Sequence, residues 1–305
     1  MREDRGAVLI NALVIVLVIS SVAAALLTRA ESARLRTAGT QAAGQLDLYL
    51  DAAEALLPAL LQSAGPDGTA VHRGQDWAQV GRVYDIDRGR VTVELADLQG
   101  RLNVNWLSRA DDAYAQDSFA RLFDAIDLPR SLLREITDFV SPGGPRNINP
   151  YLRRDPPVQP RGGPVAVLAE LRLVEGMTPD RFAVLQRHVS AIPFDKLLNL
   201  NTASVPVLRA ALAPFPEEQV TELIETLRTG YLESRSEIRN RTIELLETED
   251  VDHLPFDRIT IAGNWFEARL TAELDGNAAV RRVTLERDEA DRETTRVAYR
   301  WAEYD

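Results

Sequence analysis

Cysteine is absent from this 305-residue chain, lysine occurs only as Lys196, and there are three histidines. Without cysteine the chain cannot form disulfide bonds, thiolate nucleophiles or zinc–cysteine centres. The histidines, His72, His188 and His253, are far apart in sequence and lack metal-ligand spacing. The chain also lacks a phosphate-binding glycine loop, a nucleophile elbow and a dinucleotide fingerprint. We therefore expect a protein that is not an enzyme and holds no cofactor.

Positive charge is scarce relative to negative charge. Lysine and arginine together number 35 against 46 acidic residues, which gives a formal net charge of -11. Nucleic-acid binding depends on neutralising phosphates with Lys and Arg. We expect no nucleic-acid partner.

The N-terminus carries the strongest local signal. Residues 7–28 form an uncharged, mostly apolar run, about the length that a helix needs to cross a bilayer. A short charged segment precedes it and ends at Gly6, so the expected cleavage site, Gly6–Ala7, lies before the apolar run. Two alternatives are a plain anchor that is not cleaved and a signal peptide cleaved near residues 23–25.

Apolar residues continue at helical spacing beyond the apolar run. They recur every three or four positions, at Leu35, Ala38, Ala42, Leu46, Tyr49, Ala53, Leu56 and Leu60. This predicts one rod from the membrane to about Pro58, with that stripe buried against a folded domain.

Strand patterns flank a long helical block. Strands are expected at 82–86, 90–95, 102–105, 258–262, 265–274, 279–286 and 296–301. Helices are expected at 118–125, 131–140, 165–174, 178–189, 205–212, 217–232 and 233–246, with Ser131 and Thr178 placed to begin two of them. The predicted class is α+β: a transmembrane and stem helix on a small antiparallel sheet, with a large all-α insertion.

A Leu-Asn-x-Asn phrase occurs twice, with Asn103 and Asn105 and again with Asn199 and Asn201. Each precedes a helix, and asparagine caps helix starts and bonds local backbone. The second phrase also resembles the opening of helix-hairpin-helix DNA-binding modules, so a membrane-tethered DNA-binding protein is an alternative. However, the turn at 213–218 has no glycine, two prolines and two carboxylates where phosphate would lie.

Several stretches together resemble the type II secretion minor pseudopilin K family. They are residues 97–105, 155–157, 167–177 and 198–203, and the residues that carry the resemblance are Asp97, Gln99, Gly100, Asn103, Asn105, Glu170, Leu171, Gly176, Asn199, Asn201 and Thr202. The resemblance implies a prepilin leader at 1–6, cut by a prepilin peptidase and followed by N-methylation of Ala7. It further implies a transmembrane helix at 7–28, a pilin-like domain at 29–107 and 256–305, and an insertion at 108–255. Two units like the sterile alpha motif, about 108–195 and 196–255, would make up the insertion.

The resemblance also implies a role in assembly. Most pilins and pseudopilins place glutamate fifth after the cut, where Asn11 stands, and family K is similar in lacking it. The expected protein is a single-pass inner-membrane subunit with a periplasmic C-terminal domain. It would cap or initiate the secretion pseudopilus together with minor pseudopilins I and J and the other pseudopilins. A minor type IV pilus tip subunit is the alternative within this class.

Calcium is implied by the family resemblance alone. Asp138, Asp155 and Glu170 are weak candidate ligands, because Ca²⁺ takes six to eight oxygens that include several carboxylates. Residues 141–144, Ser-Pro-Gly-Gly, stand where the family commonly has acidic residues.

Overall fold

The structure is a computed structural model that describes residues 3–303 except 63, 65–69, 80, 249–250, 253, 289–290 and 292–293. For residues 3–12 and 303 the backbone alone is described. The first two residues of the expected leader and His253 therefore lie outside the described residues.

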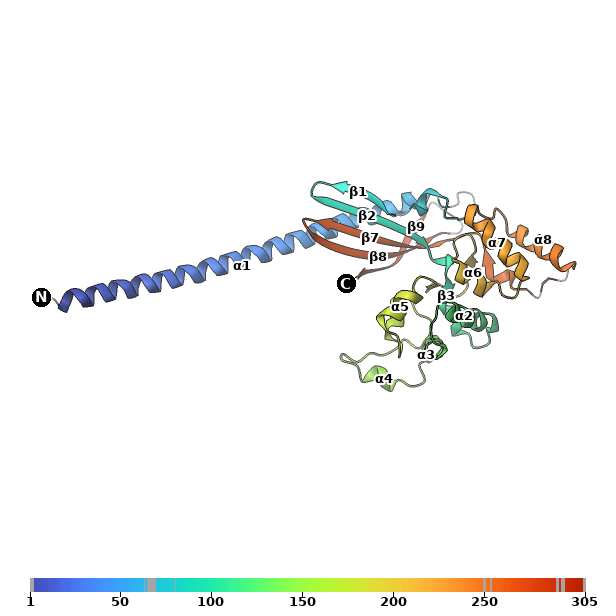
Figure 1. Ribbon diagram of the computed structural model, residues 1–305, viewed down its shortest axis with the longest axis horizontal. Helices are drawn as coiled ribbons and strands as arrows, with labels where there is room; N and C mark the ends of the chain where they lie inside the picture. The colour runs from blue at the N-terminus through green and yellow to red at the C-terminus, as the bar shows by residue number, and fades with distance from the viewer. Residues whose placement is uncertain are drawn as a thin grey trace.

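A single helix, α1 (Glu3–Leu61), accounts for the predicted rod. Its N-terminal half projects far from the rest of the molecule (Figure 1) and leaves Leu13, Leu17 and Leu27 more than half exposed. The helix is long and apolar enough to cross a membrane, and its apolar 18-residue stretch has a mean hydropathy of 2.3. Its C-terminal half lies against a sheet.

The buried stripe of α1 begins later than predicted. Leu35 and Leu56 are exposed, whereas Leu46, Leu50 and Leu57 are buried. Ala38 is exposed as well. The prediction was wrong at these three positions, because the helix meets the sheet only beyond about residue 45 and presents the face that runs through Leu50 and Leu57. Pro58 does not end the helix, which runs on to Leu61.

Five antiparallel strands form the sheet, in the order β1-β2-β7-β8-β9. Their bounds are β1 (Arg82–Ile86), β2 (Gly89–Asp97), β7 (Trp265–Leu274), β8 (Asn277–Arg287) and β9 (Thr295–Glu303). Alternate residues such as Val93, Leu270 and Val283 are buried against α1 in one core. The first two and the last three predicted strands are therefore confirmed, with ends that match or are shifted by one to two residues.

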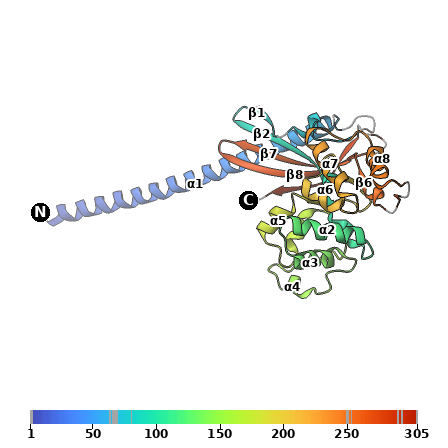
Figure 2. The same ribbon diagram turned by 45° about the vertical axis from the view of Figure 1, so that its right-hand side comes forward.

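Between β2 and β7 the chain forms a helical block at the end of the sheet remote from the N-terminus of α1 (Figures 1 and 2). Its helices are α2 (Ala113–Ala125), α3 (Arg130–Val140), α4 (Asn149–Leu152), α5 (Pro179–Leu185), α6 (Val205–Ala211), α7 (Glu217–Thr229) and α8 (Arg235–Leu246). Its short 3₁₀-helices are η3 (Leu98–Gly100), η4 (Val104–Ser108), η5 (Leu168–Leu173) and η6 (Phe256–Arg258), and a further one, η2 (Asp76–Ala78), precedes β1. This block has its own hydrophobic core, separate from the core between α1 and the sheet.

Two expected strands of the sheet belong instead to two-stranded parallel ladders. β3 (Leu102–Asn103) pairs with β4 (Val189–Ser190), and β5 (Leu198–Asn199) pairs with β6 (Ile259–Thr260). The placement of 102–105 and 258–262 among the sheet strands was therefore wrong. A run of two to four apolar residues gives no sign of which partner it will pair with.

Two predicted helix starts have different outcomes. Thr178 caps α5 through a hydrogen bond from Arg181 N–H to Oγ1, with Pro179 in the first turn, as predicted. Ser131 does not cap α3, because that helix already begins at Arg130 with Pro129 in the cap position. The predicted helix at 178–189 ends at Leu185, since Val189 enters strand β4.

Candidate functional site

Asp97 lies where the sheet meets the helical block. It ends β2 and is 6% exposed. Its Oδ1 accepts a hydrogen bond from the Gln99 N–H (2.8 Å), and its Oδ2 accepts from Asn199 Nδ2 and Thr202 Oγ1, each at 2.7 Å. Burial raises the pKa of Asp97, although these hydrogen bonds act in the opposite direction. One carboxylate thus connects the last residue of a sheet strand to the second half of the block.

Two neighbours of Asp97 complete this junction. Gln99 donates to the Leu197 carbonyl (3.0 Å) and accepts from the Asn264 N–H (2.7 Å). A Cβ on Gly100 would lie 2.5 Å from Thr202 Oγ1 and 2.7 Å from its carbonyl oxygen, so only glycine fits there. The two segments in which the chain passes between the sheet and the block, after Asp97 and before Trp265, are thereby fixed to each other.

The Leu-Asn-x-Asn phrases share one local geometry. Asn103 Oδ1 accepts from the Asn105 N–H, and Asn199 Oδ1 accepts from the Asn201 N–H, both at 3.1 Å. Each first asparagine ends a strand of a parallel ladder. The repeat predicted from sequence is therefore also a repeat in structure.

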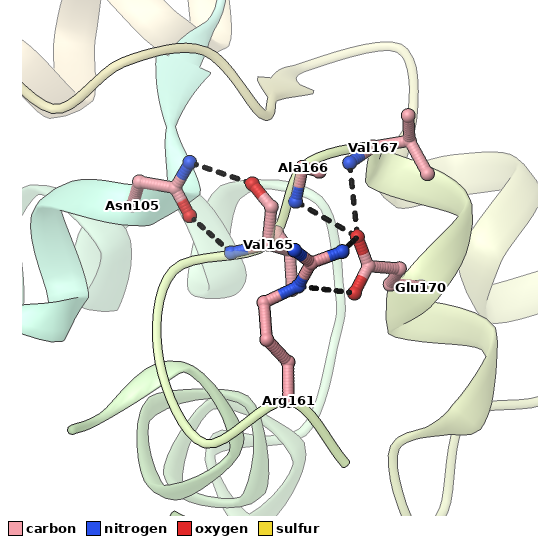
Figure 3. A network of polar contacts seen from close by, with 6 residues as sticks. All are labelled: Asn105, Arg161, Val165, Ala166, Val167 and Glu170. Carbon is pink, nitrogen blue, oxygen red and sulfur yellow. Dashed lines mark hydrogen bonds and ion pairs between the residues drawn. The ribbon is translucent and has the colours of Figure 1, made fainter. Parts of the chain in front are cut away.

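The second asparagine of each phrase holds a distant loop by its backbone. Asn105 donates to the Val165 carbonyl and accepts from the Val165 N–H, both at 2.9 Å (Figure 3). It also donates to the Ile192 carbonyl at 2.9 Å. Asn201 likewise donates to the Leu232 carbonyl (3.0 Å) and accepts from the Leu232 N–H (2.8 Å). The prediction that the asparagines bond local backbone and cap a helix start is confirmed at Asn103, which caps η4. The amides of Asn105 and Asn201 instead bind segments 60 and 31 residues away.

Glu170 organises the segment beside Val165. Its Oε1 accepts hydrogen bonds from the N–H groups of Ala166 (2.8 Å) and Val167 (3.1 Å), and Arg161 contacts the same carboxylate (Figure 3). These bonds hold residues 165–167 outside any helix, so the predicted helix at 165–174 was wrong and only the 3₁₀-helix η5 forms. Leu171 is fully buried and Gly176 has a φ of +79°, so both have structural roles.

The candidate calcium ligands do not fit a calcium ion. Both oxygens of Asp138 accept hydrogen bonds from Arg146, and the Glu170 carboxylate is engaged by backbone N–H groups and Arg161. Asp155 is exposed. Among the residues that the structure describes there is no group of three or more His, Asp or Glu that could hold a metal.

The N-terminal candidates all lie on α1. Gly6, Ala7 and Asn11 lie in its first turns, where the backbone alone is described. They are far from the Asp97 junction, at the other end of the molecule (Figure 1).

Sequence reasoning missed Arg287, which is 1% exposed at the end of β8. It donates to the carbonyls of Ala64 and Leu61 just beyond and at the end of α1, and to the carbonyl of Gly263 (2.8 Å). Strand alternation was the available signal, since Arg287 has the same parity as the inward Val283 and Leu285. An inward arginine at a strand end indicates a buried cap for helix carbonyls.

Comparison with known proteins gives consistent matches. A family model described as type II secretion system (T2SS), protein K, matches residues 100–194. A relative named type II secretion system protein K from Klebsiella pneumoniae is 30% identical over 71% of this chain and 72% of its own length. Relatives with the same name from Aeromonas hydrophila (26% identical, 91% of both chains) and Pseudomonas aeruginosa (28%, 80% of this chain and 78% of the relative) also match.

A solved structure shows the same fold. One chain in the crystal structure of the GspK-GspI-GspJ complex from the enterotoxigenic Escherichia coli type 2 secretion system is similar with a TM-score of 0.68. It is 21% identical and covers 88% of this chain and 100% of its own length.

Proposed function

Because this chain belongs to the type II secretion system protein K family, we propose that it caps the tip of the secretion pseudopilus and helps to initiate its assembly. The observation that carries this proposal is the position of the helical block. It lies at the end of the sheet opposite the membrane-spanning end of α1 (Figure 1). In a fibre built by stacking such subunits along their helices, this block would occupy the space of the subunit above.

The exposed N-terminal half of α1 anchors the chain in a membrane. We propose that this is the inner membrane, that the C-terminal domain is periplasmic, and that prepilin peptidase cuts between Gly6 and Ala7 before Ala7 is methylated. The intact mass of the mature protein tests this step. Loss of residues 1–6 supports it, and an uncut chain or one that starts after Ala25 contradicts it.

Asn11 supports a position at the end of the fibre, with no further subunit above this one. An intramembrane carboxylate is costly unless a partner satisfies it, and the amide of Asn11 cannot form a charge pair with the N-terminal amine of another subunit. A tip subunit has no need of that pair. We propose that this difference confines the chain to the end of the fibre.

We propose minor pseudopilins I and J as the direct partners, with the other pseudopilins below them. The similarity to a chain of the GspK-GspI-GspJ complex supports this. The proposed activity is assembly and mechanical transmission without bond chemistry. The proposed division is a leader at 1–6, a span at 7–28, pilin-like parts at 29–107 and 256–305, and two helical units at about 108–195 and 196–255.

Labelling of pseudopili tests the tip position. An epitope inserted at Gly143, which is exposed in the loop after α3 and where a Cβ would meet nothing within 4 Å, is expected to bind gold-labelled antibody at one end of each fibre. Labels spaced along the fibre would contradict the cap, and a matched epitope on the major pseudopilin provides the control for access.

A further inference from the structure

A cleft of about 410 Å³ lies between the helical block and the sheet. Its charged side chains are Arg101, Arg172, Arg187, Arg282 and Glu267. The block contributes through η5, α5 and the residues after α5, and the sheet contributes through β7, β8 and β9. The cleft therefore gathers four arginines around one carboxylate in a chain whose net charge is -11.

The single carboxylate is already used within the cleft. Glu267 Oε2 lies 3.0 Å from Arg282 Nη1 and 3.7 Å from Arg101 Nη1, and all three side chains are less than one-fifth exposed. Arg172 and Arg187 are exposed and have no carboxylate partner among the residues that the structure describes. The guanidinium of Arg172 instead lies 4.3 Å from the centre of the Phe182 ring.

The excess positive charge also acts on a neighbouring histidine. Burial lowers the pKa of His188, and the charges of Arg101 and Arg187 lower it further. The positive potential of the cleft therefore extends to the boundary between the two ladders, where His188 contacts Ser204.

The remaining walls are suited to a polypeptide. Trp301 on β9 and Phe182 on α5 supply aromatic surface, and Leu168 supplies aliphatic surface. β9 is the edge strand of the sheet, and an edge strand offers backbone N–H and C=O groups to an added chain. A polyanion such as nucleic acid fits less well, because Glu267 lies in the cleft and the chain as a whole repels phosphate.

We propose that this cleft binds an acidic segment of another protein, with its carboxylates on Arg172 and Arg187 and its apolar side chains against Trp301 and Phe182. Arginine guanidinium groups bind carboxylates through two parallel hydrogen bonds, which gives both strength and orientation. This site goes beyond the tip role and does not rest on it.

Peptide binding to the purified full chain in mild detergent tests the proposal. The probe is a labelled peptide of alternating Glu and Val, and a Gln and Val peptide of the same length is the neutral comparison. Fluorescence anisotropy is expected to show at least tenfold tighter binding of the acidic peptide. The double variant R172E/R187E is expected to lose this preference. R172K/R187K is expected to keep a preference for the acidic peptide but to bind it more weakly, because lysine retains the charge without the two parallel hydrogen bonds.

The matched control is R121E/R134E, which changes the net charge equally. Both arginines are exposed, lie outside the cleft and have no carboxylate partner in the described part of the chain. Wild-type binding that does not distinguish the two peptides, or equal weakening in both double variants, would overturn the proposal. So would tighter binding of anionic vesicles or of single-stranded DNA that depends on the same two arginines. No pseudopilus takes part in this assay, so its result is independent of the tip proposal.

Discussion

Replacing Asn105 with alanine tests how the helical block is held together. Asn105 is 3% exposed, and its amide makes three hydrogen bonds of 2.9 Å to Val165 and Ile192. Each bond contributes about 1 kcal/mol net, and the buried backbone groups left behind gain no water. We expect N105A to lower the local free energy of opening by about 3 kcal/mol, which corresponds to roughly a 150-fold change in equilibrium.

Hydrogen–deuterium exchange of the full chain in detergent measures this change. Peptides that cover residues 160–195 are expected to exchange about two orders of magnitude faster in N105A, while the strands of the sheet keep their wild-type rates. N201A is expected to move the effect to the segment around Leu232, since Asn201 binds that residue in the same manner. Asn240 is exposed on α8, so N240A is the control. Wild-type exchange at 160–195 in N105A would refute the reasoning.

Three further predictions concern the Asp97 junction and calcium. G100A is expected to lower the thermal midpoint by the equivalent of about 2 kcal/mol or more, because its Cβ would overlap Thr202 backbone; G163A, with open space around its Cβ, serves as the control. Burial raises the pKa of Asp97, so the folded chain binds this proton more tightly than the unfolded chain. The buried negative charge therefore destabilises the fold above the folded-state pKa, and this destabilisation disappears as the pH falls through that pKa. The free energy of unfolding of wild type relative to D97N is therefore expected to rise from pH 7 to pH 4 in denaturant titrations. Excess EGTA is expected to leave the thermal midpoint unchanged, because Arg161 occupies the Glu170 carboxylate; a fall of several degrees that calcium restores would contradict this.

The parts of the fold that the sequence predicted are those with long periodic patterns. The α1 rod and strand β7 (Trp265–Leu274) present many residues in one register, so their type follows from spacing alone. The predictions for short segments were wrong because these segments lack such long patterns. η5 was predicted as an α-helix because its apolar spacing is helical, but Glu170 and Asn105 bind the backbone that would have begun that helix.

The motif residues were identified from sequence, but their partners were not. The asparagines of both phrases were predicted to bond local backbone and cap helix starts, which holds at Asn103. For Asn105 and Asn201, no local pattern indicates that an amide will bind a backbone segment 60 or 31 residues away. Such partners depend on how the two ladders bring distant chain segments together. Asp97 is similar, since Asn199 and Thr202 approach it only after the second phrase has folded.

The junction explains how a bulky block can be held firmly on the stem helix and sheet. The block joins the sheet through two neighbouring strands, since Asp97 of β2 pairs with Phe266 of β7. Gln99 bonds one crossing to the other at Asn264, and Arg287 connects Gly263 to the end of α1. Because these polar groups are buried, separating the block from the sheet would expose each of them without its partner. Backbone and buried hydrogen bonds therefore join the stem to the helical block together, and we expect the two to behave as one rigid unit.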